Sequence, residues 1–305
     1  METNINNIIQ NKYTVISKIG NGKFGTVYLG KTNKENVAIK FDNSSIGILK
    51  HEVSILYYLN EKKSLGIPRI IWYGISKTEN PITDSSGEYI LGITSPSIHI
   101  PCFIMPYYDC TLKEYISSQS TFTYTMLNKM LSILKNIHEL FVIHRDLKPD
   151  NFMIKNGEIF LIDFGLATFY IDGKTGIHFE CNKNRTEIVG SLLYASYNSH
   201  LGYTHSRRDD CIQLGYIFLY IILGYLPWEC IRMTGIPHFH SNLVQTNINH
   251  PYNQERCKRK EITSILDIPE LYSKDNNIII SYISICYTLN YEDIPIYICN
   301  KKNKE

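Results

Sequence analysis

Four short polar motifs follow one another along this chain of 305 residues, and their order constrains the fold more than any other feature. A glycine-rich stretch, GNGKFGTV, occupies residues 20–27, and VAIK follows at 37–40. HRDLKPDN comes much later, at 144–151, and DFG stands at 163–165. Each motif offers groups suited to binding phosphate or a metal ion. The fold therefore has to let motifs that are far apart in the sequence contribute to the same reaction.

The glycine-rich stretch lies between two strand-like runs, at 13–19 and 26–31. Missing side chains let backbone amides close over phosphate oxygens, and we therefore assign this turn to phosphate binding. Taken alone, the motif fits a plain tight hairpin better. Only the motifs that follow favour the phosphate assignment.

Lys40 lies near the end of a third strand-like run, at 36–41, and a helical pattern follows at 48–59. Glu52 in that helix is spaced to pair with the ammonium group of Lys40 and hold it against the α and β phosphates of a nucleotide. A structural alternative makes Lys40 an exposed lysine and Glu52 a solvated helix residue.

The stretch 144–151 follows an amphipathic helical pattern and is expected to be a loop. Asp146 is predicted to accept or orient the proton of a substrate hydroxyl, and Lys148 to neutralise a transferring phosphoryl group. Asn151 offers an amide oxygen to a magnesium ion, and Asp163, after the apolar run 159–162, offers a carboxylate to magnesium.

Composition excludes several classes of protein. A formal net charge of +2 gives no global field that favours nucleic acid or an anionic membrane as the main partner. The eight cysteines are scattered with no C-x-x-C pair, which predicts reduced structural thiols. Residues 1–11 lack a basic, apolar signal segment, and the most apolar run, 214–226, is shorter than the ~20 residues of a membrane span. We expect an intracellular protein, cytoplasmic or nuclear, with 214–226 as a buried helix.

The two parts of the chain differ in pattern. Strand-like runs, including 70–73 and 102–107, dominate before Asp109, and helical patterns at 111–117, at 126–139 and from Asp210 dominate after it. A small β lobe followed by a larger helical lobe is expected. The polar stretch 76–97 is predicted to be a long exposed loop.

Longer runs in the second half carry a resemblance to a known family. HRDLKPDNF at 144–152 is joined by YASYN at 194–198, HLG at 200–202, SRRDD at 206–210 and LPW at 226–228. From about residue 13 to 297 the chain resembles the protein kinases, and these runs resemble the casein kinase 1 family in particular. YASYN stands where most kinases carry Ala-Pro-Glu.

The resemblance implies an α+β, bilobal protein kinase fold, with a small antiparallel sheet and one main helix in the N-lobe and a mostly helical C-lobe. It implies a kinase domain at 13–298, divided into N-lobe 13–105, hinge 106–109 and C-lobe 110–298, with an extension at 1–12 and a tail at 299–305. It also implies that Asp210 hydrogen-bonds backbone amides near Asp146.

The same resemblance implies that the chain binds ATP and Mg²⁺ and acts on serine and threonine of protein substrates. We also expect a monomer. Met105 becomes the gatekeeper behind the adenine. The predicted catalytic residues are Asp146 and Lys148, the predicted metal ligands are Asn151 and Asp163, and the predicted ATP-binding residues are Ile19, Gly20, Asn21, Gly22, Lys23, Phe24, Gly25, Val27, Ala38, Lys40, Glu52, Met105, Tyr107 and Tyr108.

Serine and threonine are favoured because Lys148 stands two residues after the base, and because Gly190-Ser191 is similar to the family's Gly-Thr. The family has an arginine that reads phosphorylated substrates at the position where this chain has Leu193, so we expect little preference for such substrates. The basic stretch 256–260 is either an anion site or a solvated helix face. His238 and His240, in an insertion at 236–253, are read as loop composition rather than a metal site.

Phosphorylation of Thr168, Thr175, Thr186 or Ser191, ordering the segment through Arg145, is possible, although the resemblance implies that activity does not require it. Two other functions were weighed against an active protein kinase: an inactive kinase fold used as a scaffold, and a small-molecule kinase. All four of Lys40, Asp146, Asn151 and Asp163 are present, which disfavours the scaffold. The YASYN and SRRDD runs disfavour the small-molecule kinase.

Overall fold

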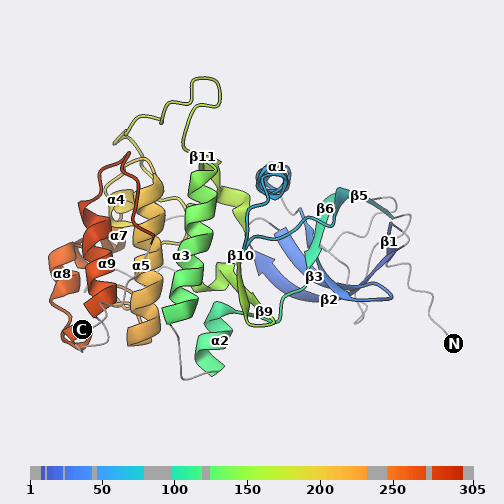
Figure 1. Cartoon of the computed structure of the whole chain (residues 1–305), viewed down its shortest axis with the longest axis horizontal. Coiled ribbons are helices and arrows are strands. Elements are labelled where there is room, and N and C mark those ends of the chain that lie inside the picture. The colour runs from blue at the N-terminus through green and yellow to red at the C-terminus, as the bar shows by residue number, and fades with distance from the viewer. Residues whose placement is uncertain are drawn as a thin grey trace, which may run out of the picture. The chain divides into compact units, whose positions relative to one another are not determined.

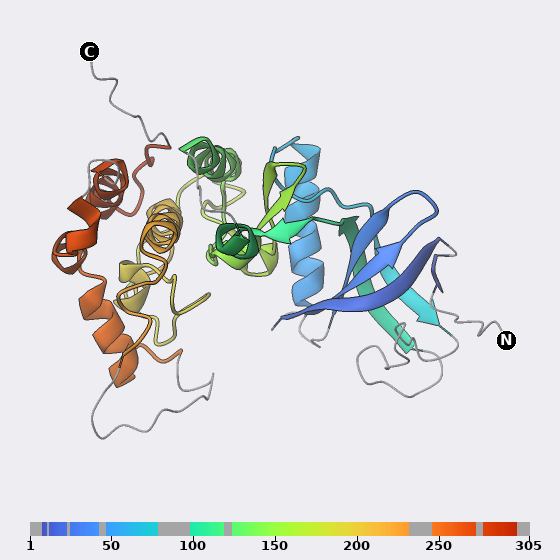
Figure 2. The same ribbon diagram turned by 90° about the horizontal axis from the view of Figure 1, so that it is seen from below.

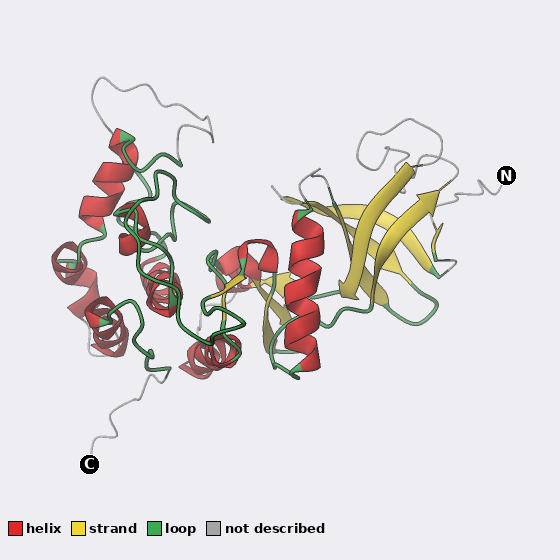
Figure 3. Ribbon diagram, turned by 90° about the horizontal axis from the view of Figure 1, so that it is seen from above, coloured by secondary structure: helices red, strands yellow, loops and turns green. Residues whose placement is uncertain are grey.

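The computed structural model describes residues 8–10, 12–22, 25–42, 47–78, 98–118, 124–231, 246–272 and 277–297. The chain divides into two compact units, the first formed by Met1–Asp109 and Lys155–Gly165, the second by Cys110–Ile154 and Leu166–Glu305. Figure 3 shows that strands dominate the first unit and helices the second. The α+β fold class with a small antiparallel sheet and a helical part is thereby confirmed.

The first unit contains a six-stranded antiparallel sheet with the strand order β1-β2-β3-β4-β6-β5 (Figure 1). Its strands are β1 (Ile8–Ile9), β2 (Tyr13–Gly22), β3 (Gly25–Lys31), β4 (Asn36–Phe41), β5 (Trp72–Thr78) and β6 (Ile98–Pro106). The helix α1 (Ile48–Glu61) and the strand β10 (Glu158–Leu161) belong to the same unit.

Strand β4 shows how the sequence divides the sheet into two faces. Side chains alternate between faces along a strand, so Val37, Ile39 and Phe41 lie on one side. There they join a buried apolar cluster with residues of β1, β2, β3 and β6. Ala38 and Lys40 are left on the opposite side of the same strand.

The predicted loop at 76–97 is wrong at its beginning, because residues 76–78 belong to β5. Strand β5 starts at Trp72 rather than at residue 70, and β6 starts at Ile98, before the expected 102. The two strands pair with each other from Trp72↔Ile104 to Thr78↔Ile98. Because of this pairing, each strand continues beyond the apolar residues by which the sequence marked it. Residues 79–97 lie outside the part of the chain that the structure describes.

The second unit is mostly helical. It contains α2 (Leu112–Ser118), α3 (Tyr124–Glu139), α4 (Tyr197–His200), α5 (Arg207–Leu223), α7 (Pro251–Arg259), α8 (Ile262–Leu266) and α9 (Asn277–Thr288). Short strands β7 (Cys110–Thr111) and β9 (Phe152–Lys155) pair with each other, as do β8 (Val142–Ile143) and β11 (Thr168–Phe169).

Helix α5 is the centre of the second unit and packs against both α3 and α9 (Figures 1 and 2). Its residues from Asp209 to Leu219 are all buried, which confirms the first half of the buried helix predicted at 214–226. The second half of that prediction is wrong, because the helix ends at Leu223 and Tyr225 is exposed. The backbone N–H of Ser206 donates to Asp209 at the helix start, and Gly224 ends the helix with a φ of 75°. No helix among the described residues is long and apolar enough to span a membrane.

The seven cysteines among the described residues are free thiols, as the scattered spacing predicted. Cys181 and Cys230 are exposed, and three others are buried. Residues 1–7, 11, 232–245 and 298–305, which include most of the predicted extension, His238, His240 and the predicted tail, lie outside the described residues.

Candidate active site

Several predicted ATP-binding side chains share one face of the sheet in the first unit. Val27 lies opposite Lys40, and Ala38 lies opposite Met105. Directly paired residues of antiparallel strands point to the same side, so these four residues lie on the face opposite the apolar cluster. Ala38, Lys40 and Met105 are buried. Strand pairing therefore brings together, on one face of the sheet, residues that are separated in the sequence.

Lys40 forms two ion pairs on this face. Its Nζ lies 2.7 Å from Glu52 Oε2 in α1 and 2.9 Å from Asp163 Oδ1. Lys40 is 7% exposed and Glu52 only 2%, so neither the exposed lysine nor the solvated glutamate of the structural alternative is correct. The predicted ion pair is present, and Asp163, far away in sequence, shares the ammonium group.

Burial opposes the charge on Lys40, yet Glu52 and Asp163 together hold its pKa above the ordinary lysine value. Burial raises the pKa of Glu52, and Lys40 works against that rise. An ammonium group bonded to two carboxylates stays protonated and keeps a fixed position. Such a cation is suited to holding phosphate oxygens.

The glycine-rich turn joins β2 to β3. Thr26 Oγ1 donates to Asn21 Oδ1 at 2.9 Å, which ties the two strand ends together. A Cβ added at Gly25 would lie 2.5 Å from the carbonyl oxygen of Phe41, whereas Gly20 and Gly22 have ordinary room. At Gly25 the missing side chain is therefore required by packing against β4. Lys23 and Phe24 lie outside the described residues.

The remaining predicted ATP-binding residues flank the sheet. Ile19 on β2 is 46% exposed, and Tyr107 is half-buried beyond the end of β6. Tyr108 is buried, with its ring centroid 5.1 Å from that of Phe160. Its side chain thus serves packing within the first unit, and burial raises the pKa of its hydroxyl.

In the second unit, the carboxylate of Asp146 is held from several directions. Its Oδ1 accepts the backbone N–H of Ser191 at 2.6 Å, and its Oδ2 accepts the ammonium group of Lys148 at 2.8 Å. Lys148 also donates to the hydroxyl of Ser191 at 3.2 Å. Asn151 Nδ2 donates to the backbone carbonyl of Asp146 at 2.9 Å. The structure thus brings Asp146, Lys148 and Asn151 together, with Ser191 as a fourth member.

Gly190 makes this arrangement possible. Its φ of 85° is left-handed, and an added Cβ would lie 2.5 Å from the carbonyl oxygen of Arg145 and 3.1 Å from Asp146 Oδ1. Arg145 and Asp163 adopt left-handed φ values of 70° and 64° without being glycines. Such conformations cost energy and concentrate at functional sites.

Asp210 supports the loop that carries Asp146. Its carboxylate accepts the backbone N–H of His144 at 2.7 Å and that of Arg145 at 2.9 Å, which confirms the expected scaffolding. Two histidines that the sequence did not single out also reach it, with Nε2 of His138 and of His205 each 3.0 Å away. Burial opposes ionisation, but these hydrogen bonds hold the pKa of Asp210 well below its ordinary value.

Gln213 is a further residue that the motifs missed. Its Oε1 accepts the backbone N–H of Leu147 at 2.9 Å, and its Nε2 donates to the carbonyl of Arg145 at 3.4 Å. Gln213 stands three residues after Asp210, so both lie on one face of α5. A polar residue at that spacing in an otherwise apolar helix was the available signal.

The longer sequence runs meet around residues 191–198. Asp209 Oδ1 accepts the hydroxyl of Ser196 at 2.6 Å and the amide of Asn198 at 3.2 Å. The indole N–H of Trp228 donates to the carbonyl of Leu193 at 2.7 Å. The YASYN, SRRDD and LPW runs therefore form one connected structure in the second unit.

Lys260 fixes the same segment from the other side. It is fully buried, and its Nζ lies 3.1 Å from the carbonyl oxygen of Leu192, 2.7 Å from that of Ala195 and 3.0 Å from His200 Nε2. Burial lowers the pKa of Lys260 well below its ordinary value. For Lys260, the prediction of a solvated helix face is therefore wrong. Anion binding by the rest of 256–260 stays a prediction.

Arg145 already has an internal partner. Its Nε donates to the backbone carbonyl of Leu166 at 2.6 Å. Burial and, after it, the charge of Arg185 lower its pKa. Ser191 bonds Lys148, and the hydroxyl of Thr175 lies 3.2 Å from Asp172 Oδ1. Phosphorylation of this segment stays a prediction.

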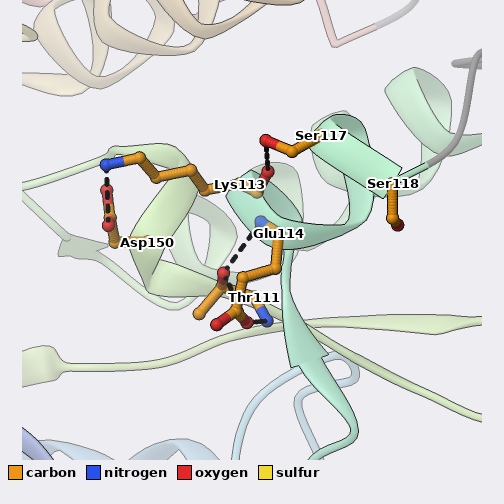
Figure 4. A pocket seen from close by; sticks show the side chains of 6 residues that line it. All are labelled: Thr111, Lys113, Glu114, Ser117, Ser118 and Asp150. Carbon is orange, nitrogen blue, oxygen red and sulfur yellow. Dashed lines mark hydrogen bonds and ion pairs between the residues drawn. The ribbon is translucent and has the colours of Figure 1, made fainter.

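Figure 4 shows a polar pocket in the second unit, lined by Thr111, Lys113, Glu114, Ser117, Ser118 and Asp150. Lys113 Nζ lies 3.6 Å from Asp150 Oδ1, and Glu114 accepts the backbone N–H of Thr111 at 2.8 Å. None of the predicted catalytic, metal or ATP-binding residues lines this pocket.

The predicted magnesium ligands suit a hard cation by their chemistry. Asp163 offers carboxylate oxygens. The amide nitrogen of Asn151 donates to Asp146, so the Oδ1 of Asn151 is the atom that can bind a cation. Among the described residues, no group of three or more His, Cys, Asp or Glu side chains could hold a metal ion by itself.

The chain matches the family model described as "Protein kinase domain" over residues 13–283. The matched range includes every residue that the sequence assigned to ATP, to catalysis and to the metal.

Proposed function

Because the family model covers most of its length, the chain belongs to the protein kinase family, and we propose that it is a serine/threonine kinase of casein kinase 1 type. A protein kinase domain transfers phosphoryl groups to protein hydroxyls. The proposal adds that the donor is the γ-phosphoryl group of ATP with Mg²⁺, that the acceptors are serine and threonine, and that the domain spans residues 13–298 and acts as a monomer.

The observation that carries the proposal is the restrained carboxylate of Asp146. Ser191 and Lys148 each occupy one of its oxygens, so the group cannot rotate freely. A base held in this way accepts the proton of a substrate hydroxyl as the oxygen attacks phosphorus. Lys148, bonded beside it, compensates the charge of the transferring group.

The first unit supplies the nucleotide site in this proposal. Lys40, fixed by Glu52 and Asp163, binds the phosphates, and the face that carries Val27 and Ala38 packs on the adenine. Asp163 and Asn151 are the residues that would hold Mg²⁺, which would neutralise charge at the phosphate oxygens when bound. Positioning and charge stabilisation account for the catalysis, without a covalent intermediate.

The acceptor class rests on two residues of the second unit. Lys148 contacts both Asp146 and the hydroxyl of Ser191, and these contacts support the serine/threonine assignment. The YASYN and SRRDD runs contact each other, and the LPW run contacts Leu193 directly before YASYN, which supports casein kinase 1 type. Leu193 brings no positive charge to this region, so we propose that substrates need no prior phosphorylation.

The test is transfer of radiolabelled γ-phosphate from ATP and Mg²⁺ to casein and to a peptide panel. Wild type should label serine or threonine, and Asp146→Asn should retain ATP binding but lose at least a hundredfold in kcat. Asp172→Asn, in an exposed turn, is the matched control and should keep wild-type activity. Tyrosine labelling contradicts the acceptor class, and a large gain from priming phosphates contradicts the role of Leu193. Retained ATP binding without transfer by wild type favours the scaffold.

A further inference from the structure

His138, at the end of α3, is buried between two hydrogen-bond partners. It is 1% exposed; its Nε2 lies 3.0 Å from Asp210 Oδ2 and its Nδ1 lies 2.7 Å from the hydroxyl of Tyr297. Burial lowers the pKa of His138 and so favours the neutral ring. Asp210 is ionised and can only accept, so Nε2 carries the proton and Nδ1 accepts from the Tyr297 O–H.

Tyr297 belongs to the segment that follows α9, and this segment is attached to the start of α5. The guanidinium group of Arg207 donates to the carbonyl of Glu292, and Arg208 donates to the carbonyl of Leu289 at 3.3 Å. The rings of Tyr297 and His138 meet edge to face, with centroids 5.6 Å apart. In Figures 1 and 2 the dark red end of the described chain runs from α9 towards α3.

A continuous chain of hydrogen bonds thus leads from Tyr297 to the catalytic loop. Tyr297 donates to His138, His138 donates to Asp210, and Asp210 accepts the backbone N–H groups of His144 and Arg145. Asp146 follows immediately in the sequence.

We propose that Tyr297 is a positioning residue for catalysis: its hydroxyl holds the ring of His138 in the orientation in which Nε2 reaches Asp210, and so fixes the loop before Asp146. This inference rests on the proposed kinase function. Without the hydroxyl, the buried Nδ1 loses its hydrogen-bond partner, and the ring is free to turn away from Asp210. The hydrogen bond from Nε2 to the carboxylate then weakens, and with it the support of the loop.

Tyr297→Phe tests this, because it removes one oxygen atom and keeps the ring. Loss of one buried hydrogen bond is expected to reduce kcat about tenfold, with the KM values for ATP and peptide within about twofold of wild type. Tyr282→Phe is the matched control, since it removes a buried hydroxyl that donates to the carbonyl of Cys211 at 3.1 Å. It keeps all four hydrogen bonds that Asp210 accepts and should keep the wild-type kcat.

A double-mutant comparison tests whether Tyr297 acts through His138. In His138→Gln the imidazole ring that Tyr297 holds is absent, so adding Tyr297→Phe should not lower kcat further. An equal additional loss in that background overturns the proposal. So does a Tyr297→Phe enzyme with wild-type kcat, or one in which KM changes instead of kcat.

Nuclear magnetic resonance separates this inference from the proposed function. The ¹⁵N shifts of the His138 ring should report a hydrogen bond at Nδ1 in wild type and the loss of that bond in Tyr297→Phe. The amide signals of His144 and Arg145 should shift in the variant. An unchanged ring and unchanged amides overturn the inference even if wild type transfers no phosphate, whereas the absence of transfer by itself counts only against the kinase assignment.

Discussion

Replacing Asp210 by asparagine tests the hydrogen-bond centre beneath the catalytic loop. The Oδ1 atom of Asp210 accepts hydrogen bonds from the backbone N–H of Arg145 and from Nε2 of His205. Its Oδ2 atom accepts hydrogen bonds from the backbone N–H of His144 and from Nε2 of His138. An asparagine keeps one carbonyl oxygen and presents an NH₂ group on the other side. Whichever way the amide turns, one backbone N–H and one imidazole then face a donor.

The expected cost follows from that count. Two hydrogen bonds to a charged group are lost, each of about 1.5–3 kcal/mol, so Asp210→Asn should lower the free energy of unfolding by about 3–6 kcal/mol. This is a large part of the ~5–15 kcal/mol of a typical domain. Because His144 and Arg145 lose support directly before Asp146, the proposed base, phosphate transfer should fall at least tenfold even where the protein stays folded.

Urea unfolding followed by circular dichroism measures the free energy, and peptide phosphorylation at low temperature measures the activity. Asp267→Asn, in the surface turn that ends α8, provides a comparison that removes a carboxylate without touching this network. A free energy of unfolding within about 1 kcal/mol of wild type, together with wild-type activity, would refute the reasoning.

Gly190→Ala should abolish transfer, because its Cβ meets the carbonyl of the residue before the base at 2.5 Å, whereas Gly173→Ala has open space and should be silent in the same assay. Lys260→Met should lower the unfolding free energy by about 3 kcal/mol or more in urea, because three acceptors lose their donor; unchanged stability contradicts this. Acidification below about pH 6.5 should destabilise the protein by up to about 2.7 kcal/mol per pH unit. Burial lowers the pKa of His138 and, with Lys260 nearby, that of His200, so only the unfolded state binds these two protons; a flat stability profile between pH 6.5 and 5 contradicts this.

The fold class was predictable because the periodicity of side chains changes along the chain. Strand β4 matches the run 36–41 at both ends, and α1 begins at the predicted Ile48. Strand β5 was misjudged because its last residues are polar and are held by pairing with β6 rather than by their own propensity. Local composition cannot report a partner that is remote in the sequence.

The ion pair of Lys40 with Glu52 was predictable from motif spacing, and so was the contact of Asp210 with the loop before Asp146. The role of Gln213 was within reach, since helical spacing from Asp210 points to it. Lys260 was not, because a lysine in a basic run looks solvated until its burial is known.

The sequence by itself determined the chemistry of this protein, because Asp146, Lys148 and Asn151 lie within one short loop and their spacing alone brings them together. Only the tertiary structure decided what holds that loop in place. Tyr297 and His138 meet across 159 positions of the chain, and their contact depends on how α3, α5 and the segment after α9 pack. The protonation state and partners of a buried group follow from its surroundings, which no local pattern of residues specifies.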